Sequence, residues 1–142
     1  MAGEIILYGA TLERSSDEST WTVIPGVTSI TLPSVTQEYV ETTSLDSTGG
    51  YREYIGGLKD AGEASFSQNY SRAAMDQADA DDGVKLYYRM TLASPDGGAT
   101  TGDVHEFEGI RTASPVTDDI GGLVRIDNTL RISGERTYTA GA

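Results

Sequence analysis

Residues 84–92, with the sequence VKLYYRMTL, decide the fold class of this chain. Every second position from Val84 to Leu92 is apolar, and most positions between them are polar or charged. A period of two places successive side chains on opposite faces of an extended strand. The run therefore predicts a β-strand whose buried face consists of Val84, Leu86, Tyr88, Met90 and Leu92.

The same alternation returns between Gly122 and Gly134, where only Asn128 interrupts the apolar face. Between these two runs, Ser94–Gly98 is dense in turn-forming residues, and Asp103–Thr112 has the composition of a returning strand. Residues 84–112 therefore predict a β-hairpin.

Five earlier runs have weaker strand patterns, partly because Pro25 and Pro33 restrict their surroundings to sheet edges or bends. They are Ile5–Glu13, Thr22–Ile24, Val27–Leu32, Val35–Thr43 and Gly62–Tyr70. Seventeen glycines and many Ser and Thr residues separate these short runs. The chain is therefore predicted to be mainly β, with seven or eight strands.

One Ala-rich segment departs from the strand pattern and predicts a short α-helix over residues 71–82. Ser71 is suitably placed as its N-cap and Gly83 as its stop signal. We expect Ala74, Met75 and Ala78 to contact the sheet. We expect the acidic side chains Asp76, Asp79, Asp81 and Asp82 to face water.

Residues 45–60 lack strand periodicity and predict a long loop. Two glycine pairs, Gly49-Gly50 and Gly56-Gly57, bracket the sequence YREYI. Structureless loops longer than about 12 residues are usually functional or disordered. Aromatic residues and Arg are enriched in protein interfaces, so this loop is predicted to be a contact surface.

Composition excludes several classes of function. The 142 residues allow one domain, and the absence of Cys removes thiol catalysis and thiolate zinc sites. A net charge of −12 disfavours DNA binding, which needs clustered basic residues. His105 is the only histidine, so a multi-His metal site is impossible. We predict no catalytic residue, metal or cofactor, and a soluble protein without signal peptide or membrane span.

A resemblance extends over residues 20 to 70. It rests on WTVIPGVTSI at 21–30, TTSLD at 42–46, GYREYI at 50–55 and GLKDAG at 57–62. This series resembles the major tail tube proteins of long-tailed, siphovirus-type bacteriophages, and the later helix and strands agree with that family in order.

The resemblance implies a two-sheet β-sandwich or barrel with one short helix. It implies one tail-tube domain over 1–142, with short flexible segments at about 1–4 and 136–142. It further implies a structural virion protein without enzyme activity. Such proteins form stacked, hexameric rings, and the resulting hollow tail tube carries phage DNA into the host.

Partners follow from the same resemblance. They are other copies of the chain, a tape measure protein, the tail-tip initiator complex and a tail terminator, with double-stranded DNA passing through transiently. The implied location is the virion tail, after synthesis in the cytoplasm of the host bacterium.

Two sets of residues are predicted to serve this role. The inter-ring contacts in the long loop are Leu45, Asp46, Tyr51, Arg52, Glu53, Tyr54 and Ile55. The candidate acidic residues lining the lumen are Glu38, Glu41, Glu106, Glu108 and Asp127. Negative charge on the lumen would repel DNA phosphates and keep the sliding DNA from adhering.

The sequence leaves three rival interpretations open. The chain could be the tube protein of a contractile tail or secretion system. It could also be a non-viral β-sandwich module that binds carbohydrate or acts as an adhesin, with Trp21 and tyrosines as stacking platforms. A small glycosidase using Glu106 and Glu108 ranks last, because many surface strands carry paired carboxylates.

Overall fold

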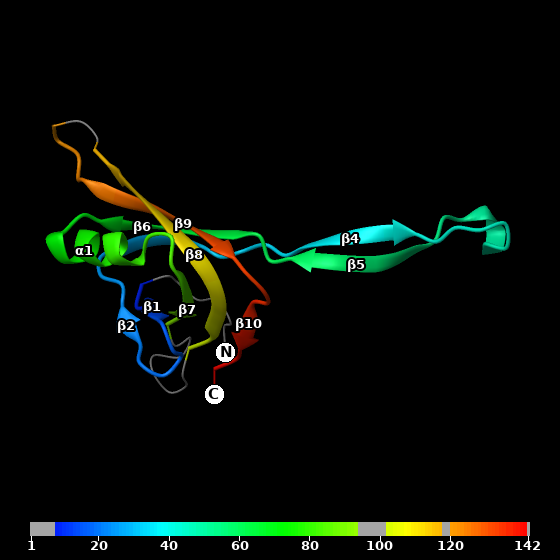
Figure 1. The fold of residues 1–142 in the computed structure, drawn as a ribbon, viewed down its shortest axis with the longest axis horizontal. Helices are drawn as coiled ribbons and strands as arrows, with labels where there is room; N and C mark the ends of the chain where they lie inside the picture. Colours follow the sequence, from blue (N-terminus) through cyan, green and yellow to red (C-terminus); the bar gives the residue numbers. More distant parts are fainter. Residues whose placement is uncertain (1–7, 94–101, 118–119, 142) are drawn as a thin grey trace.

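The computed structural model describes residues 8–93, 102–117 and 120–141, and it is built mainly from β-strands (Figure 1). The strands are β1 (Thr11–Ser15), β2 (Thr22–Val23), β3 (Val27–Thr31), β4 (Thr36–Glu41), β5 (Tyr54–Asp60), β6 (Glu63–Asn69), β7 (Lys85–Thr91), β8 (Val104–Val116), β9 (Arg125–Ile132) and β10 (Thr137–Thr139). One α-helix, α1 (Arg72–Asp81), lies between β6 and β7. The predicted mainly β fold with one short helix is confirmed.

Eight strands form one antiparallel sheet in the order β2-β1-β7-β8-β9-β6-β3, with β10 paired to β8. The long strand β8 belongs to both halves of this sheet, because Val104–Ile110 pairs with β7 and Gly109–Val116 pairs with β9. The sheet folds over on itself at β8, and its two halves pack as the layers of a sandwich. The strands that the structure describes do not close into a barrel.

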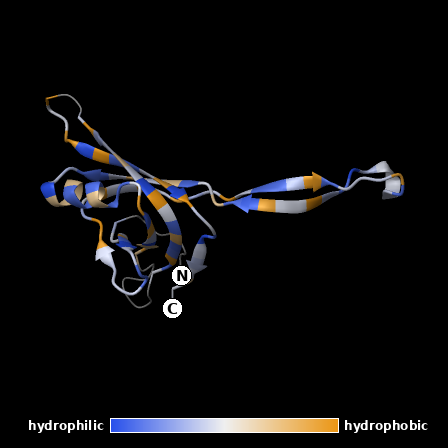
Figure 2. Ribbon diagram, in the orientation of Figure 1, coloured by the Kyte–Doolittle hydropathy of each residue, from blue (hydrophilic) through white to orange (hydrophobic). Residues whose placement is uncertain are grey.

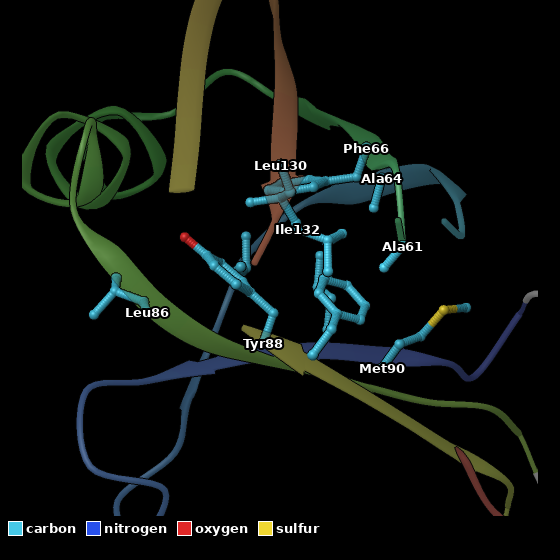
Figure 3. Packing of buried hydrophobic residues seen from close by; sticks show 11 residues of the cluster. Ala61, Ala64, Phe66, Leu86, Tyr88, Met90, Leu130 and Ile132 are labelled. Carbon is cyan, nitrogen blue, oxygen red and sulfur yellow. The ribbon is translucent and has the colours of Figure 1, made fainter. Parts of the chain in front are cut away.

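The core lies between these two layers (Figure 3). Leu86, Tyr88 and Met90 of β7 face Leu130 and Ile132 of β9 across the interior. This confirms the predicted alternation for Leu86, Tyr88 and Met90, since these side chains are at most 5% exposed. The prediction that Val84 is buried is wrong, because it precedes the first residue of β7 and is 45% exposed. Full burial of a large apolar side chain contributes about 1.5–3 kcal/mol.

The helix prediction is confirmed at both ends. The Ser71 hydroxyl accepts a hydrogen bond from the Ala74 amide at 3.1 Å, and Gly83 follows the last turn with φ +74°. Ala74 and Ala78 are fully buried, as expected for the face that contacts the sheet. The helix is therefore held by a cap at its start and by a packed small-residue face.

The prediction that Asp81 faces water is wrong. Its carboxylate is buried and pairs with Arg14 Nε at 2.7 Å and with Arg111 Nη1 at 3.5 Å. The last turn of α1 lies next to β8, where the Gly83 amide donates to the Arg111 carbonyl at 2.9 Å. Burial raises the pKa of Asp81, and the two guanidinium groups oppose that shift.

Arg111 itself is fully buried and explains the interruption at Asn128. Its Nε donates to Asn128 Oδ1 at 2.8 Å, and its Nη2 donates to Gln68 Oε1 at 2.7 Å. Its guanidinium also lies 5.1 Å from the centroid of the Phe66 ring. A buried cation needs such partners, so the polar residue in β9 is a requirement of the core rather than a defect.

The loop predicted over 45–60 is correct only for its first part, because Tyr54–Asp60 forms β5 and pairs with β4. Two adjacent glycines and a β-bulge opposite Gln37–Tyr39 break the two-residue period, which hides the strand in the sequence. Within the predicted flexible segment 136–142, Thr137–Thr139 forms β10. The predicted turn at 94–98 and residues 1–4 lie outside the described residues.

Candidate functional site

Strands β4 and β5 form a two-stranded arm that projects from the sandwich along the long axis of the molecule (Figure 1). Every residue of β4, and all of β5 except Gly57, is exposed. Polar and apolar residues are interspersed along it without a regular period (Figure 2). An isolated two-stranded ribbon is marginally stable in water at best, so the arm needs support from outside itself.

One face of the arm is aliphatic. Val40 and Ile55 are directly opposite each other in the register, and Leu58 shares their face beyond the bulge. These side chains are 52%, 57% and 80% exposed, respectively. We call this surface the aliphatic face.

The opposite face carries two tyrosines. Tyr39 is opposite Gly56, and Tyr54 is opposite Glu41. Gln37 covers Gly56, where an added Cβ would collide with its side-chain amide. Tyr39 and Tyr54 are 70% and 53% exposed. We call this surface the tyrosine face.

The tip of the arm is fixed by its own hydrogen bonds. Ser47 Oγ donates to a Glu53 carboxylate oxygen at 3.0 Å, and the Glu53 amide donates to Thr43 Oγ1 at 2.8 Å. A short 3-10 turn at Thr48–Gly50 reverses the chain. Glu53 thus has a role within the tip, while Leu45 and Tyr51 extend into solvent.

The base of the arm is attached to the sandwich by Asp60. Its carboxylate accepts from the Gly62 amide at 2.8 Å and pairs with Arg131 at 2.8 Å. The Gly62 hydrogen bond and Arg131 hold the pKa of Asp60 below its usual value. Gly62 has φ +77°, and a Cβ there would meet the Ser34 carbonyl oxygen at 2.8 Å.

The structure separates the predicted lumen residues into two groups. Glu38 and Glu41 lie on the arm, in β4. Glu106 and Glu108 in β8 and Asp127 in β9 lie on the outer surface of the sandwich, on strand faces opposite the core. Lys85 pairs with Glu108 at 3.5 Å, and Ser67 donates to Asp127 at 2.8 Å.

The outer face of the β3-β6-β9-β8 layer is rich in hydroxyl groups. A shallow hollow on it is lined by side chains that include Ser29, Thr31, Ser65, Ser67, Asp127 and Thr129. Both borders of this layer lack a partner strand within the described residues. The outer edge of β3 is unpaired. On β8, pairing with β7 stops at Ile110 and is followed by an isolated bridge between Asp82 and Arg111, so residues 112–116 lack a partner on that side among the described residues.

Trp21 and His105, two residues considered in the sequence analysis, contact other side chains of the chain. The Arg89 guanidinium lies 4.2 Å from the centroid of the Trp21 ring and pairs with Glu13 at 3.1 Å, which covers one face of a possible stacking platform. The His105 ring packs against Tyr138, and burial lowers the pKa of His105. Among the described residues no cluster suited to a metal ion occurs, and none of their helices could span a membrane.

Sequence reasoning missed the arm residues of β4 and the end of β5. The sequence pattern places Tyr39, Val40 and Leu58 in an ordinary strand or a loop, although they form both faces of the arm. The available signal was the apolar pair Tyr39-Val40, because adjacent apolar residues in a strand require burial on both of its faces.

The fold defined by this sandwich and arm is that of proteins that build or terminate tail tubes. A sheath/tube terminator of the extracellular contractile injection system PVC is 11% identical, with 99% of each chain covered and a TM-score of 0.74. The SPP1 tail tube is 14% identical over 96% of this chain and 80% of that chain, with a TM-score of 0.63. The tail of an empty GTA particle, in C6 symmetry, is 22% identical over 92% and 95%, with a TM-score of 0.61.

These likenesses establish the fold. No protein-family model matches the sequence, and neither does any curated protein.

Proposed function

We propose that this chain is a structural subunit that assembles into rings, and that the rings stack into the hollow tail tube through which phage DNA passes. The arm carries this proposal, because its exposed faces need partners that a single chain does not provide. Fold similarity to tail tube proteins over nearly the whole chain supports the same role.

Ring formation is supported by the two unpaired borders of the β3-β6-β9-β8 layer. These four strands are antiparallel throughout. In a ring, the copies are related by rotation about a common axis. Because each copy contributes an even number of antiparallel strands to the layer, β3 of one copy would run antiparallel to β8 of the next. The borders are thus suited to pair between copies, which would remove exposed sheet edges. Six copies per ring is the number that the resemblance implies.

This closure would direct the hydroxyl-rich face and Asp127 toward the lumen. Glu106 and Glu108 would line the lumen only along the first part of β8, which bends away from that layer to pair with β7. Glu38 and Glu41 would lie on the arm.

The hydroxyl-rich face also carries Arg125 and Arg131, which pair with Asp127 and Asp60. A surface of hydroxyl groups and paired charges within a strongly acidic protein would hold DNA weakly, since phosphate binding relies on clustered basic residues.

Contacts between rings are assigned to the arm. Leu45, Asp46, Tyr51 and Arg52 would make them at the tip, with Tyr54 and Ile55 along the first part of β5. Glu53 would act mainly by shaping the tip. The tape measure protein, tail-tip initiator and tail terminator are the further partners, and the virion tail is the location after synthesis in the host cytoplasm.

A contractile machine is the second candidate function. The TM-scores of 0.74 and 0.72 to chains of the PVC sheath/tube terminator and of the PVC sheath-tube complex favour it over a carbohydrate-binding or adhesin module and over a glycosidase. A tube of this kind would bind a sheath on its exterior, whereas a siphovirus-type tube would not.

Negative-stain electron microscopy with light scattering on the concentrated protein tests the proposal. Hollow tubes of stacked rings are the expected result. A chain that stays monomeric at high concentration, also after addition of preformed tube ends as nuclei, would contradict it. Decoration of the tubes by a purified sheath protein would favour the contractile candidate.

A further inference from the structure

The arm exposes apolar side chains on both of its faces, and these faces differ in chemistry. Val40, Ile55 and Leu58 form the aliphatic face, while Tyr39 and Tyr54 form the tyrosine face. Each of these five side chains is at least 52% exposed. A ribbon that is buried on only one side would carry polar residues on the other side. The apolar residues on both faces of the arm therefore indicate that both faces become buried.

From this we infer that each arm is held between two other copies of this chain, with its aliphatic face on one copy and its tyrosine face on another. The inference rests on the proposed function and deepens it by naming the partners of the arm. The faces of a ribbon point in opposite directions, so a neighbour that presents a flat surface can cover only one of them.

Copies of the same chain are the occupants that the molecule favours. The sandwich exposes an apolar patch formed by Tyr70, Leu123 and Val124, where the Tyr70 amide donates to the Val124 carbonyl at 2.9 Å. This far-end patch lies beside the start of α1 and β9, at the opposite end of the long axis from the arm (Figure 1). Surfaces at opposite ends of one molecule pair head to tail and produce growth without closure.

The tyrosine face is partly covered from within the arm. The Gln37 side-chain amide lies over Gly56, the residue opposite Tyr39, so the backbone there is not open to a neighbour. A copy packed on this face would meet the rings of Tyr39 and Tyr54 together with the Gln37 amide, and the aromatic pair would act as its anchor.

Adjacent residues provide a matched test, because Tyr39 and Val40 point to opposite faces. A photocrosslinking phenylalanine analogue is introduced at position 39, at position 40, or at both. A small minority of the variant is mixed with isotope-labelled wild-type chain and assembled, with tube formation checked by electron microscopy. Gel electrophoresis and mass spectrometry then identify the crosslinked products.

We expect each single variant to give dimers with labelled copies, at different acceptor peptides for positions 39 and 40. The double variant is expected to give trimers, because its two faces contact different copies. Tubes that yield only dimers from the double variant, or one acceptor peptide for both positions, would overturn the inference and leave the tube function intact. Failure to assemble at all would overturn the tube function, and the inference with it.

Tyr54→Thr and Ile55→Thr provide a second measurement, since Thr keeps strand propensity while removing either face. Each is expected to raise the concentration needed for assembly by about tenfold or more. Circular dichroism of the monomers is the folding control. An unchanged assembly concentration for either variant would show that its face stays in solvent, which contradicts the inference.

Discussion

The sandwich and the arm differ in which side chains they bury. Within the sandwich even a guanidinium, that of Arg111, is fully buried and has partners from three other elements. On the arm, tyrosines and aliphatic residues remain exposed. The sandwich thus obtains its stability from within the chain, whereas in the proposed tube the arm is buried by other copies. Substitutions should therefore separate into those that unfold the monomer and those that prevent assembly.

Arg111→Leu should have the largest effect on monomer stability. It leaves the Asn128 acceptor without its donor, the Gln68 acceptor with only Asn128 Nδ2, and Asp81 with only Arg14. Loss of one partner of a buried ion pair costs about 3–5 kcal/mol, which urea unfolding monitored by circular dichroism would measure.

The double variant Arg111→Leu, Asp81→Leu sharpens this test. Asp81 still pairs with Arg14 in the single variant, so removing both charges would leave Arg14 without its carboxylate, and the double variant should regain none of the lost stability. A loss below about 1 kcal/mol for Arg111→Leu alone would mean that the buried cluster does not hold the sandwich together.

Gly62→Ala acts where the two regions join. A non-Gly residue at positive φ costs about 1–2 kcal/mol, and the new Cβ would press on the Ser34 carbonyl. We expect a lower free energy of unfolding and poorer assembly together, because the base of the arm shifts. Gly83→Ala is the matched control: φ is +74° there but no neighbouring atom lies within 4 Å, so assembly should be spared.

Ser71→Ala tests the helix on the side of the sandwich. Removing the N-cap hydroxyl that accepts from Ala74 should cost about 1 kcal/mol in thermal or urea unfolding. Ser71→Asp should keep most of that stability, since Asp is an equally good N-cap. Equal losses for both variants would contradict a capping role.

The sequence predicted the sandwich better than the arm, and the reason is physical. Alternation in residues 84–92 and 122–134 reflects burial within the chain, so it can be recognised without knowing any partner. The prediction for Asp81 fails because a carboxylate paired with Arg14 and Arg111 looks like its solvated neighbours in sequence. In β5 the glycine pair and the bulge interrupted the period. In the proposed tube the contacts that bury the arm lie in other copies, so no pattern in one chain would indicate them.

Low pH should lower the free energy of unfolding of the sandwich, because Asp17 accepts hydrogen bonds in the turn that follows β1. Asp17 accepts from the amides of Thr20 and Ser19 and from the Ser15 hydroxyl, which holds its pKa well below the usual 3.8. A lowered folded pKa gives stability that is present above about pH 4 and declines as the pH falls below it. Asp17→Asn should flatten the stability profile in that range, and an unchanged acid slope would exclude this turn as its source.

Leu45→Ser should have the smallest effect on the monomer, and it tests the comparison most directly. Leu45 is fully exposed at the tip, so its removal should change the free energy of unfolding by less than about 0.5 kcal/mol. The same substitution should reduce tube formation in light scattering, because the leucine meets its partners only after assembly. Leu130→Ala in the core is the opposite control, with an expected loss of about 2–5 kcal/mol. A marked loss of monomer stability from Leu45→Ser would show that the arm folds back onto its own chain in solution. The division between a self-sufficient sandwich and a partner-dependent arm would then be wrong.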